Sequence, residues 1–215
     1  MWYKRSDVIL FLVIALLVMT GIWVFRIISG KVLYVDRLTR DLVEKLDNTV
    51  VFAFFRWVTE LGSGTFLTPF TILMGLIFWF LFRERLQALV FALGTLSSYG
   101  VNILIKHLVE RERPAILAAA DAEGFSFPSG HAMISMVCYG LFAYFLVKKL
   151  SSSRLVLIAQ ISPALLILLI GISRYVINVH YLTDVLAGFI LGFIYLMGLI
   201  YIYEWLKSSK WKAPS

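Results

Sequence analysis

The stretch SRYVINVHYLTD, residues 173–184, places three ionisable side chains, Arg174, His180 and Asp184, between two strongly apolar runs. Ionisable groups at the edge of a membrane span are costly and usually functional. His180 and Asp184 are four residues apart, so on a helix they share one face. There the carboxylate could hold the imidazole in one tautomer and raise its basicity. The alternative is a polar cluster that only caps a helix and anchors it at the membrane interface.

The composition indicates an integral membrane protein. Hydrophobic residues make up 60% of the 215 residues and charged residues only 15%, and the mean hydropathy is +0.87. Soluble domains average about 45–50% apolar and about 25% charged residues. The length suits one compact bundle, so we expect a single transmembrane domain over residues 1–215. The only cysteine, Cys138, cannot form an intrachain disulfide.

The apolar runs predict an all-α bundle of six transmembrane helices. Each run is close to the length that crosses the hydrocarbon core of a bilayer. We place the spans at residues 8–25, 65–82, 86–105, 129–147, 155–172 and 185–205.

A mixed segment, residues 28–63, separates the first two spans. Apolar residues recur at helical spacing between residues 42 and 61, and polar residues occupy the opposite side. This pattern predicts an amphipathic helix that lies in the interface or packs across the bundle. We favour an interfacial connector, and the alternative is a lid or a lipid-entry element.

The distribution of basic residues predicts the topology. Six spans place four basic groups on one side, which the positive-inside rule assigns to the cytoplasm together with both termini. These groups also account for the net charge of +7 without a nucleic-acid partner. Residues 28–63, 107–128 and 173–184 then share the outer face. The four groups are Lys4 with Arg5, Arg83 with Arg85, Lys148 and Lys149 with Arg154, and Lys207 with Lys210 and Lys212.

Three cations on the outer face, Lys106, Arg113 and Arg174, need a counter-anion. Arginine suits a planar, bidentate grip on phosphate oxygens. The cations would also repel Mg²⁺, and Asp184 is the only firm carboxylate candidate, so we expect no metal site. The alternative for this group is ion pairing within the protein, with Glu110, Glu112 and Asp121 as partners.

The tetrapeptide Pro128-Ser129-Gly130-His131 opens the fourth span. Ser129 suits an N-cap, and Gly130 would let a ligand approach the backbone. Free amides at a helix N-terminus, together with the helix dipole, form an anion site. Simple helix capping is the alternative, and it is the commoner use of such a sequence.

Two histidines with different surroundings suggest a nucleophile and a general acid. His180, with Asp184 as partner, would attack phosphorus. His131 would protonate the leaving oxygen and later activate water. The cations would stabilise the charge of the transferring phosphoryl group. We interpret the third histidine, His107, as an interfacial residue without a catalytic role.

Three motifs carry a family resemblance: Lys106-x6-Arg113-Pro114, Pro128-Ser129-Gly130-His131 and Ser173-Arg174-x5-His180-x3-Asp184. In this order they resemble the three-part signature of the type-2 phosphatidic acid phosphatase family, which here covers residues 106–184. The resemblance implies a metal-independent lipid phosphatase with a phosphohistidine intermediate and no cofactor. It implies the same roles for His180, Asp184 and His131, and phosphate binding by Lys106, Arg113, Ser129, Gly130 and Arg174.

The short chain resembles bacterial members that act on phosphatidylglycerol phosphate, phosphatidic acid or undecaprenyl pyrophosphate. The resemblance therefore implies a multi-pass protein of the bacterial cell membrane whose partners are the bilayer and a lipid substrate. The sequence does not define the exact lipid, the role of residues 28–63 or the oligomeric state. Two other functions stay open: a lipid phosphotransferase with the same intermediate, and an anion or phospholipid transporter. Against transport, the charges lie at one membrane edge instead of at mid-depth.

Overall fold

The computed structural model describes residues 5–46, 49–114 and 124–211. Lys4, Asp121 and Lys212, which enter the sequence argument, lie outside these ranges. The described residues form helices joined by short turns and loops and contain no strand. The elements are α1 (Arg5–Ile28), α2 (Tyr34–Glu44), α3 (Val50–Glu60), α4 (Gly64–Leu76), the π-helical turn η1 (Ile77–Leu81), α5 (Arg85–Val109), α6 (Gly130–Val147), α7 (Ser153–Val176) and α8 (Leu182–Trp211).

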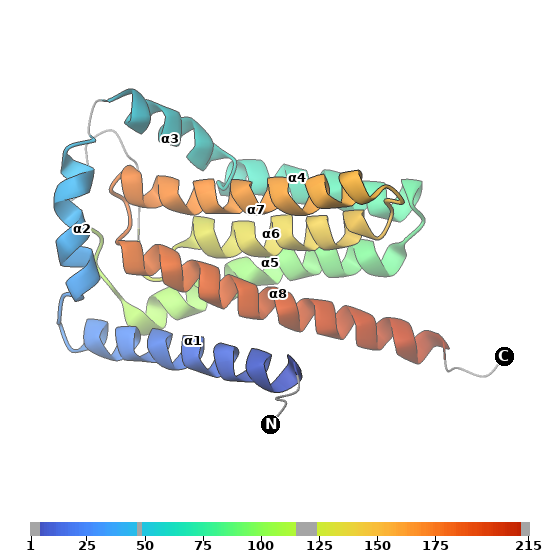
Figure 1. The fold of residues 1–215 in the computed structure, drawn as a ribbon, viewed down its shortest axis with the longest axis horizontal. Coiled ribbons are helices and arrows are strands. Elements are labelled where there is room, and N and C mark those ends of the chain that lie inside the picture. Colours follow the sequence, from blue (N-terminus) through green and yellow to red (C-terminus); the bar gives the residue numbers. More distant parts are fainter. Residues whose placement is uncertain (1–4, 47–48, 115–123, 212–215) are drawn as a thin grey trace.

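Six helical segments are long and apolar enough to cross a membrane, as the sequence predicts. They are α1, α4 with η1, α5, α6, α7 and α8. In Figure 1 these segments run along the long axis of the molecule, and α2 lies across one end of them. The beginning of α1 and the end of α8 lie away from α2. The predicted all-α membrane bundle is therefore confirmed.

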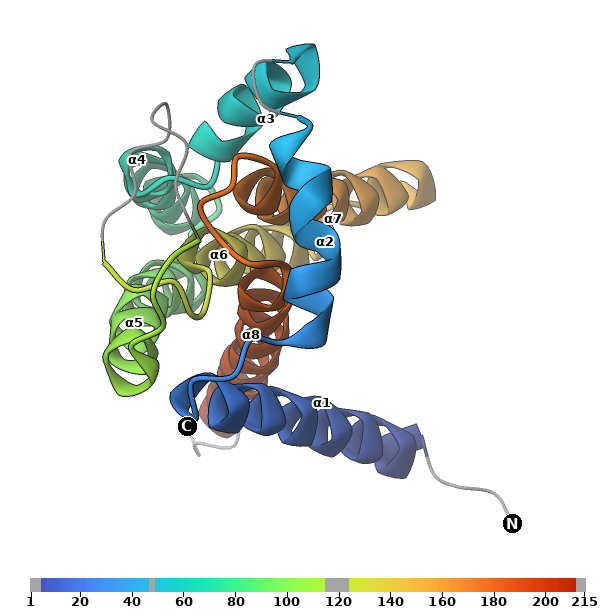
Figure 2. The same ribbon diagram turned by 90° about the vertical axis from the view of Figure 1, so that its left-hand side faces the viewer.

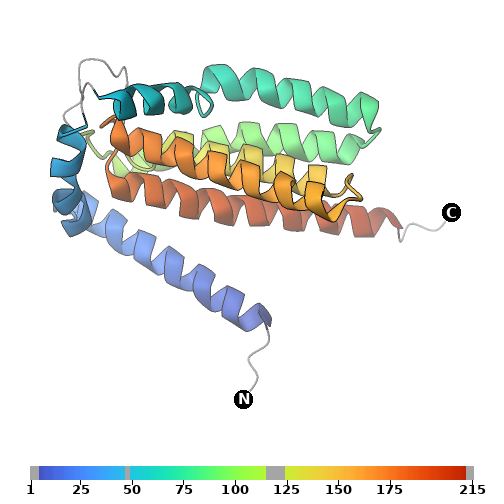
Figure 3. The same ribbon diagram turned by 45° about the horizontal axis from the view of Figure 1, so that its top comes forward.

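Helix α6 is the centre of the bundle and packs against α5, α7 and α8. Half of its span is buried inside the protein, whereas only 6% of the α1 span is buried. The core around α6 includes Val137, Leu141 and Phe145. Helix α1 diverges from the bundle toward its N-terminal end (Figure 3), and its contacts come from Trp23, Val24 and Ile27 near its other end.

Two glycines on α8 allow that helix to approach the backbone of α6 closely. A Cβ atom at Gly188 would lie 2.7 Å from the carbonyl oxygen of Ser129, and one at Gly192 would lie 2.7 Å from that of Met133. Small residues four apart permit such close helix packing in membranes. The contact fixes the start of α8 beside the start of α6, where the backbone amide of Ser129 donates to the carbonyl of Asp184 over 3.0 Å.

Residues 28–63 form two helices instead of the single helix that the sequence predicts over residues 42–61. Helix α2 ends at Glu44, and Thr49 caps a new helix, α3, by accepting a hydrogen bond from the Phe52 amide over 3.2 Å. In Figure 2, α2 passes across the ends of α7 and α8.

The protein covers the predicted apolar side only toward the end of α3, where Val58 packs against the bundle core. Val50 and Phe54 are 87% and 53% exposed. The buried face instead carries Phe52, which packs against Ile177 and Val179. Lipid chains are as apolar as leucine, so a helix at the membrane need not bury its apolar side in protein.

The close packing of α6 and α8 is testable with one pair of matched variants. Gly192→Ala places a Cβ atom against a backbone oxygen, which cannot rotate away, so α8 must shift. We expect a loss of about 1–3 kcal/mol, measured as a lower thermal unfolding midpoint in detergent. Gly198→Ala on the same helix meets no atom within 4 Å, so its midpoint should not fall. Equal midpoints for the two variants would contradict this packing.

Candidate active site

The end of the bundle that α2 crosses gathers the polar residues that the sequence singles out. It is formed by the C-terminal ends of α5 and α7, the N-terminal ends of α6 and α8, and the loops between them. The structure therefore brings the three motifs together at one end. Lys106 lies in the last turn of α5, Arg113 in the loop after it, Ser129 and His131 at the start of α6, Arg174 in the last turn of α7, His180 in the turn after it, and Asp184 in the first turn of α8.

His180 and Asp184 are neighbours, although not for the predicted reason. His180 lies before α8, so the two residues do not share a helical face. The tight turn between α7 and α8 instead brings His180 Nδ1 to 3.5 Å from Asp184 Oδ2. Both side chains are buried, with 2% and 0% of their surface exposed.

The surrounding hydrogen bonds define the tautomer of His180. Nη1 of Arg113 lies 3.3 Å from Nε2 of His180, and a guanidinium group can only donate. Nε2 must therefore accept, and Nδ1 carries the proton that faces Asp184. Burial is the largest cause that lowers the pKa of His180 to about 3; Arg174 and Arg113 lower it further, whereas Asp184 acts in the opposite direction. The ring is neutral near pH 7, with a lone pair on Nε2.

Asp184 is held on several sides. Its Oδ2 accepts from the backbone amide of Tyr181 over 2.9 Å and from the hydroxyl of Ser126. Its Oδ1 accepts from Nη1 of Arg111 over 2.6 Å. A buried carboxylate is stable only when it is hydrogen-bonded and paired in this way.

Two of the three predicted cations approach the site from α5 and the following loop. Arg113 donates from Nη1 to the carbonyl of Val179 over 2.8 Å and from Nε to that of Gly124 over 2.9 Å. Burial lowers the pKa of Arg113 from its ordinary value, and Asp184 partly offsets this effect. Lys106 donates to the carbonyl of Phe125. These bonds hold both cations at the same end of the bundle as His180, and Arg113 is in contact with its ring.

The third cation, Arg174, is held by the segment between the first two spans. Its Nη1 donates to the hydroxyl of Thr59 on α3 over 2.9 Å. Its Nε is buried and has no hydrogen-bond partner within the described residues. An unpaired buried donor of a charged group is costly. This group is therefore available for an anionic oxygen.

Ser129 occupies the N-cap position of α6, but its hydroxyl makes no capping hydrogen bond. The oxygen is buried and, in the described part of the chain, has no partner. Gly130 is needed mainly because Asn102 lies close: a Cβ atom there would be 3.0 Å from Asn102 Oδ1. The free hydroxyl and the helix N-terminus together suit a phosphate group.

His131 follows in the first turn of α6, is half-buried and has no hydrogen-bond partner among the described residues. It lies beside the turn between α3 and α4, since a Cβ atom at Gly62 would be 3.1 Å from its ring. Its ring is therefore free to donate to or accept from a bound group. His107 differs, because it is exposed and contacts the edge of the Phe125 ring.

Glu110 and Glu112, which the sequence offers as ion-pair partners for the three cations, are exposed. Within the described residues neither forms an ion pair with Lys106, Arg113 or Arg174. The nearby basic residue that does form buried ion pairs is Arg111, whose partners are Asp36 and Asp184.

Sequence reasoning missed five polar residues around the site. They are joined to it by hydrogen bonds that depend on the tertiary fold, and no motif marks them. Only Arg111 offered a signal, because it is a second arginine two positions before Arg113, in the charged run Glu110-Arg111-Glu112-Arg113. The five are Asp36, Thr59, Arg111, Ser126 and Thr183.

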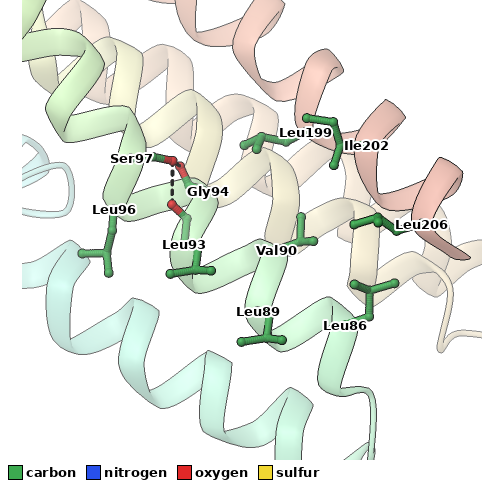
Figure 4. A pocket seen from close by; sticks show the side chains of 10 residues that line it. All are labelled: Leu86, Leu89, Val90, Leu93, Gly94, Leu96, Ser97, Leu199, Ile202 and Leu206. Atoms are coloured by element: carbon green, nitrogen blue, oxygen red, sulfur yellow. Dashed lines mark hydrogen bonds between the residues drawn. The ribbon is translucent and has the colours of Figure 1, made fainter.

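A concave surface elsewhere on the bundle carries no comparable chemistry. It lies between α5 and α8 (Figure 4) and is lined almost entirely by leucine, valine and isoleucine. The hydroxyl of Ser97, its one polar side chain, donates to the carbonyls of Leu93 and Gly94 over 2.6 and 3.1 Å. This groove is suited to apolar lipid chains and not to a reaction.

Comparisons with known proteins agree with the fold and the motifs. Phosphatidylglycerophosphatase B of Bacillus subtilis (strain 168) is 37% identical over 136 residues, which cover 63% of this chain and 66% of that protein. Dolichyldiphosphatase of Saccharomyces cerevisiae is 25% identical over 154 residues, which cover 68% of this chain and 64% of that protein. The alignments thus span just under two thirds of both relatives.

Solved structures give a broader match. The crystal structure of a transmembrane PAP2-type phosphatidylglycerolphosphate phosphatase from Bacillus subtilis superposes with a TM-score of 0.75 and 28% identity, over 87% of this chain and 95% of that chain. LpxE from Aquifex aeolicus superposes with a TM-score of 0.55 and 25% identity, over 75% and 93%. Residues 87–208, which include all three motifs, match the PAP2 superfamily. The chain is therefore a multi-pass membrane protein that belongs to the PAP2 superfamily.

Proposed function

We propose that this protein is a lipid phosphate phosphatase that works through a phosphohistidine on His180. The observation that carries the proposal is the arrangement at His180 Nε2. The imidazole is neutral, its Nδ1 faces Asp184, and the lone pair on its Nε2 faces Arg113. Beside it lie two buried donors, Arg174 Nε and Ser129 Oγ, without partners in the described part of the chain. A tetrahedral phosphate monoester supplies the oxygens that these donors lack.

In the first step Nε2 of His180 attacks phosphorus, and the bond from phosphorus to the lipid oxygen breaks. His131 gives its proton to that oxygen, so the lipid leaves as an alcohol, or as a monophosphate when the substrate is a diphosphate. The imidazole becomes positively charged as the new P–N bond forms. Asp184 stabilises that charge through the proton on Nδ1.

In the second step water cleaves the phosphohistidine. His131, now neutral, takes a proton from water, and the oxygen attacks phosphorus as the P–N bond breaks. Inorganic phosphate leaves, and His180 returns to its neutral form. Lys106, Arg113 and Arg174 bear the negative charge of the transferring group in both steps.

We propose phosphatidylglycerol phosphate as the first substrate to test, because the Bacillus subtilis relative and the Bacillus subtilis crystal structure both carry that activity in their names. Polyprenyl diphosphates such as undecaprenyl pyrophosphate are the runner-up, since another relative is a dolichyldiphosphatase. Phosphatidic acid completes the set. The lipid chains would stay in the bilayer, because the site lies at the end of the membrane spans.

We also propose that the site faces the outside of the cell membrane. The turns at the opposite end of the bundle are basic with few acidic residues, whereas acidic residues accompany the basic ones at the site end. Basic residues favour the cytoplasmic side. Both termini would then be cytoplasmic. Among the described residues the basic side chains at that end are Arg83, Arg85, Lys148, Lys149, Arg154 and Lys207, and the acidic ones are Asp7, Glu84 and Glu204.

Phosphate release by the purified protein in detergent tests the reaction. We expect release from at least one of the three lipids with EDTA present, and none above background for His180→Ala. Asp184→Asn should lower kcat by at least roughly 100-fold. Arg113→Ala and Arg174→Ala should lower kcat/KM by roughly 100- to 1,000-fold, because each removes charge stabilisation.

The control in that assay is His107→Ala, which removes an exposed histidine near the site and should stay within about twofold of wild type. Full activity in His180→Ala would overturn the assignment of the nucleophile. Loss of activity with EDTA would contradict the metal-free reaction.

Cysteine labelling tests the orientation. In a Cys138→Ala background, single cysteines replace Lys45, after α2, and Ser152, in the turn between α6 and α7. A membrane-impermeant maleimide added to intact cells should label Lys45→Cys, and Ser152→Cys only after the cells are opened. The reverse pattern would place the site on the cytoplasmic face.

A further inference from the structure

Arg111 connects the proposed catalytic carboxylate to a second buried carboxylate on α2. Its Nη1 donates to Oδ1 of Asp184 over 2.6 Å, and its Nη2 donates to Oδ2 of Asp36 over 2.7 Å. The Arg111 side chain is 9% exposed, and both carboxylates are fully buried. Two negative charges thus share one positive charge in a site with little water.

Asp36 also holds the beginning of α8. Its Oδ1 accepts from the backbone amide of Thr183 over 3.0 Å, and its Oδ2 accepts from the Thr183 hydroxyl over 2.7 Å. Thr183 belongs to the first turn of α8, where backbone amides lack partners within the helix. The carboxylate of Asp36 therefore acts as a cap that α2 supplies to α8, at the end of the helix dipole that favours negative charge.

The guanidinium of Arg111 is fixed on its remaining sides. It lies over the ring of Tyr181, with 3.9 Å from Cζ to the ring centroid, a favourable cation–π contact. Nη1 also donates to the hydroxyl of Thr183 over 2.9 Å. Neither Arg111 nor Asp36 contacts His180, and neither belongs to the three cations proposed to bind phosphate.

We propose that Asp36 and Arg111 are positioning residues of the reaction and that α2 is thereby part of the catalytic apparatus. Arg111 holds Asp184 in the orientation that faces His180 Nδ1. Asp36 takes up part of the Arg111 charge, so Asp184 keeps enough negative charge to stabilise the imidazolium that forms during phosphoryl transfer. The inference rests on the proposed roles of His180 and Asp184.

This arrangement has different consequences for the two single substitutions. Asp36→Asn leaves Arg111 opposite Asp184 alone, so the carboxylate is more fully neutralised and the imidazolium is less stable. Arg111→Gln leaves two buried carboxylates close together without a cation, and one of them must take up a proton. In that background, removal of the Asp36 charge relieves the repulsion. Asp36→Asn should therefore be harmful in the wild type but not in the Arg111→Gln variant.

The test measures kcat and KM for the wild type, both single variants and the double variant, with the lipid that the wild type hydrolyses fastest. We expect Asp36→Asn to lower kcat by about 10- to 100-fold. Losses of this size are typical when a residue that orients a functional side chain through hydrogen bonds is removed, as around metal ligands. KM should change by less than about twofold, because Asp36 does not touch the phosphate. The double variant should be no slower than Arg111→Gln, because the two residues act as one unit.

Glu84→Gln is the matched control. It makes the same change from carboxylate to amide and removes an ion pair of 2.7 Å with Lys149 at the opposite end of the bundle. Its kcat should stay within about twofold of wild type. Thermal unfolding midpoints of all variants, measured in the same detergent, show that the rates refer to folded protein.

Three results would overturn the inference. One is a kcat for Asp36→Asn close to that of Glu84→Gln. Another is a rise in KM with kcat unchanged, which would make Asp36 part of substrate binding. The third is a fold-loss in kcat for the double variant that equals the product of the two single fold-losses, which would show that the two residues act independently of each other. Activity that persists in His180→Ala would instead reject the proposed function, so the two failures are distinguishable.

Discussion

Burial of Asp184 beside His180 is the constraint on which the rest of the site depends. A carboxylate with no exposed surface at the end of a membrane bundle must be paired and hydrogen-bonded, or it would take up a proton. The protein meets this requirement with Arg111, Ser126 and the Tyr181 amide. The same groups fix the direction of the carboxylate, so that its Oδ2 faces Nδ1 of His180.

The helices supply this environment through close packing and not through a large polar interior. Gly188 and Gly192 bring the backbones of α6 and α8 together, so the start of α6, where we propose that phosphate binds, lies beside Asp184. The segment between the first two spans completes the site from outside. Helix α2 reaches it through Asp36, and α3 through the hydrogen bond from Arg174 to Thr59. The segment is thus more than the connector that its amphipathic pattern suggested.

Much of this arrangement could be predicted from the sequence because its causes are local. Apolar runs of the right length gave the six spans, and the motifs around Lys106, Ser129 and His180 named the residues that meet at one end. The break at Thr49, the bonds of Asp36 to Arg111 and Thr183, and the free hydroxyl of Ser129 depend on contacts between distant segments. No periodicity or spacing in the chain reports such contacts.

The most direct test of the account is to trap the phosphorylated enzyme. Wild-type protein is mixed with a lipid carrying a radioactive terminal phosphate, quenched in alkaline detergent, which preserves phosphohistidine, and digested for mapping. We expect label on the peptide that contains His180 in the wild type and none in His180→Ala. Label on another residue, or turnover by the wild type with no labelled protein at any time, would contradict a phosphohistidine on His180.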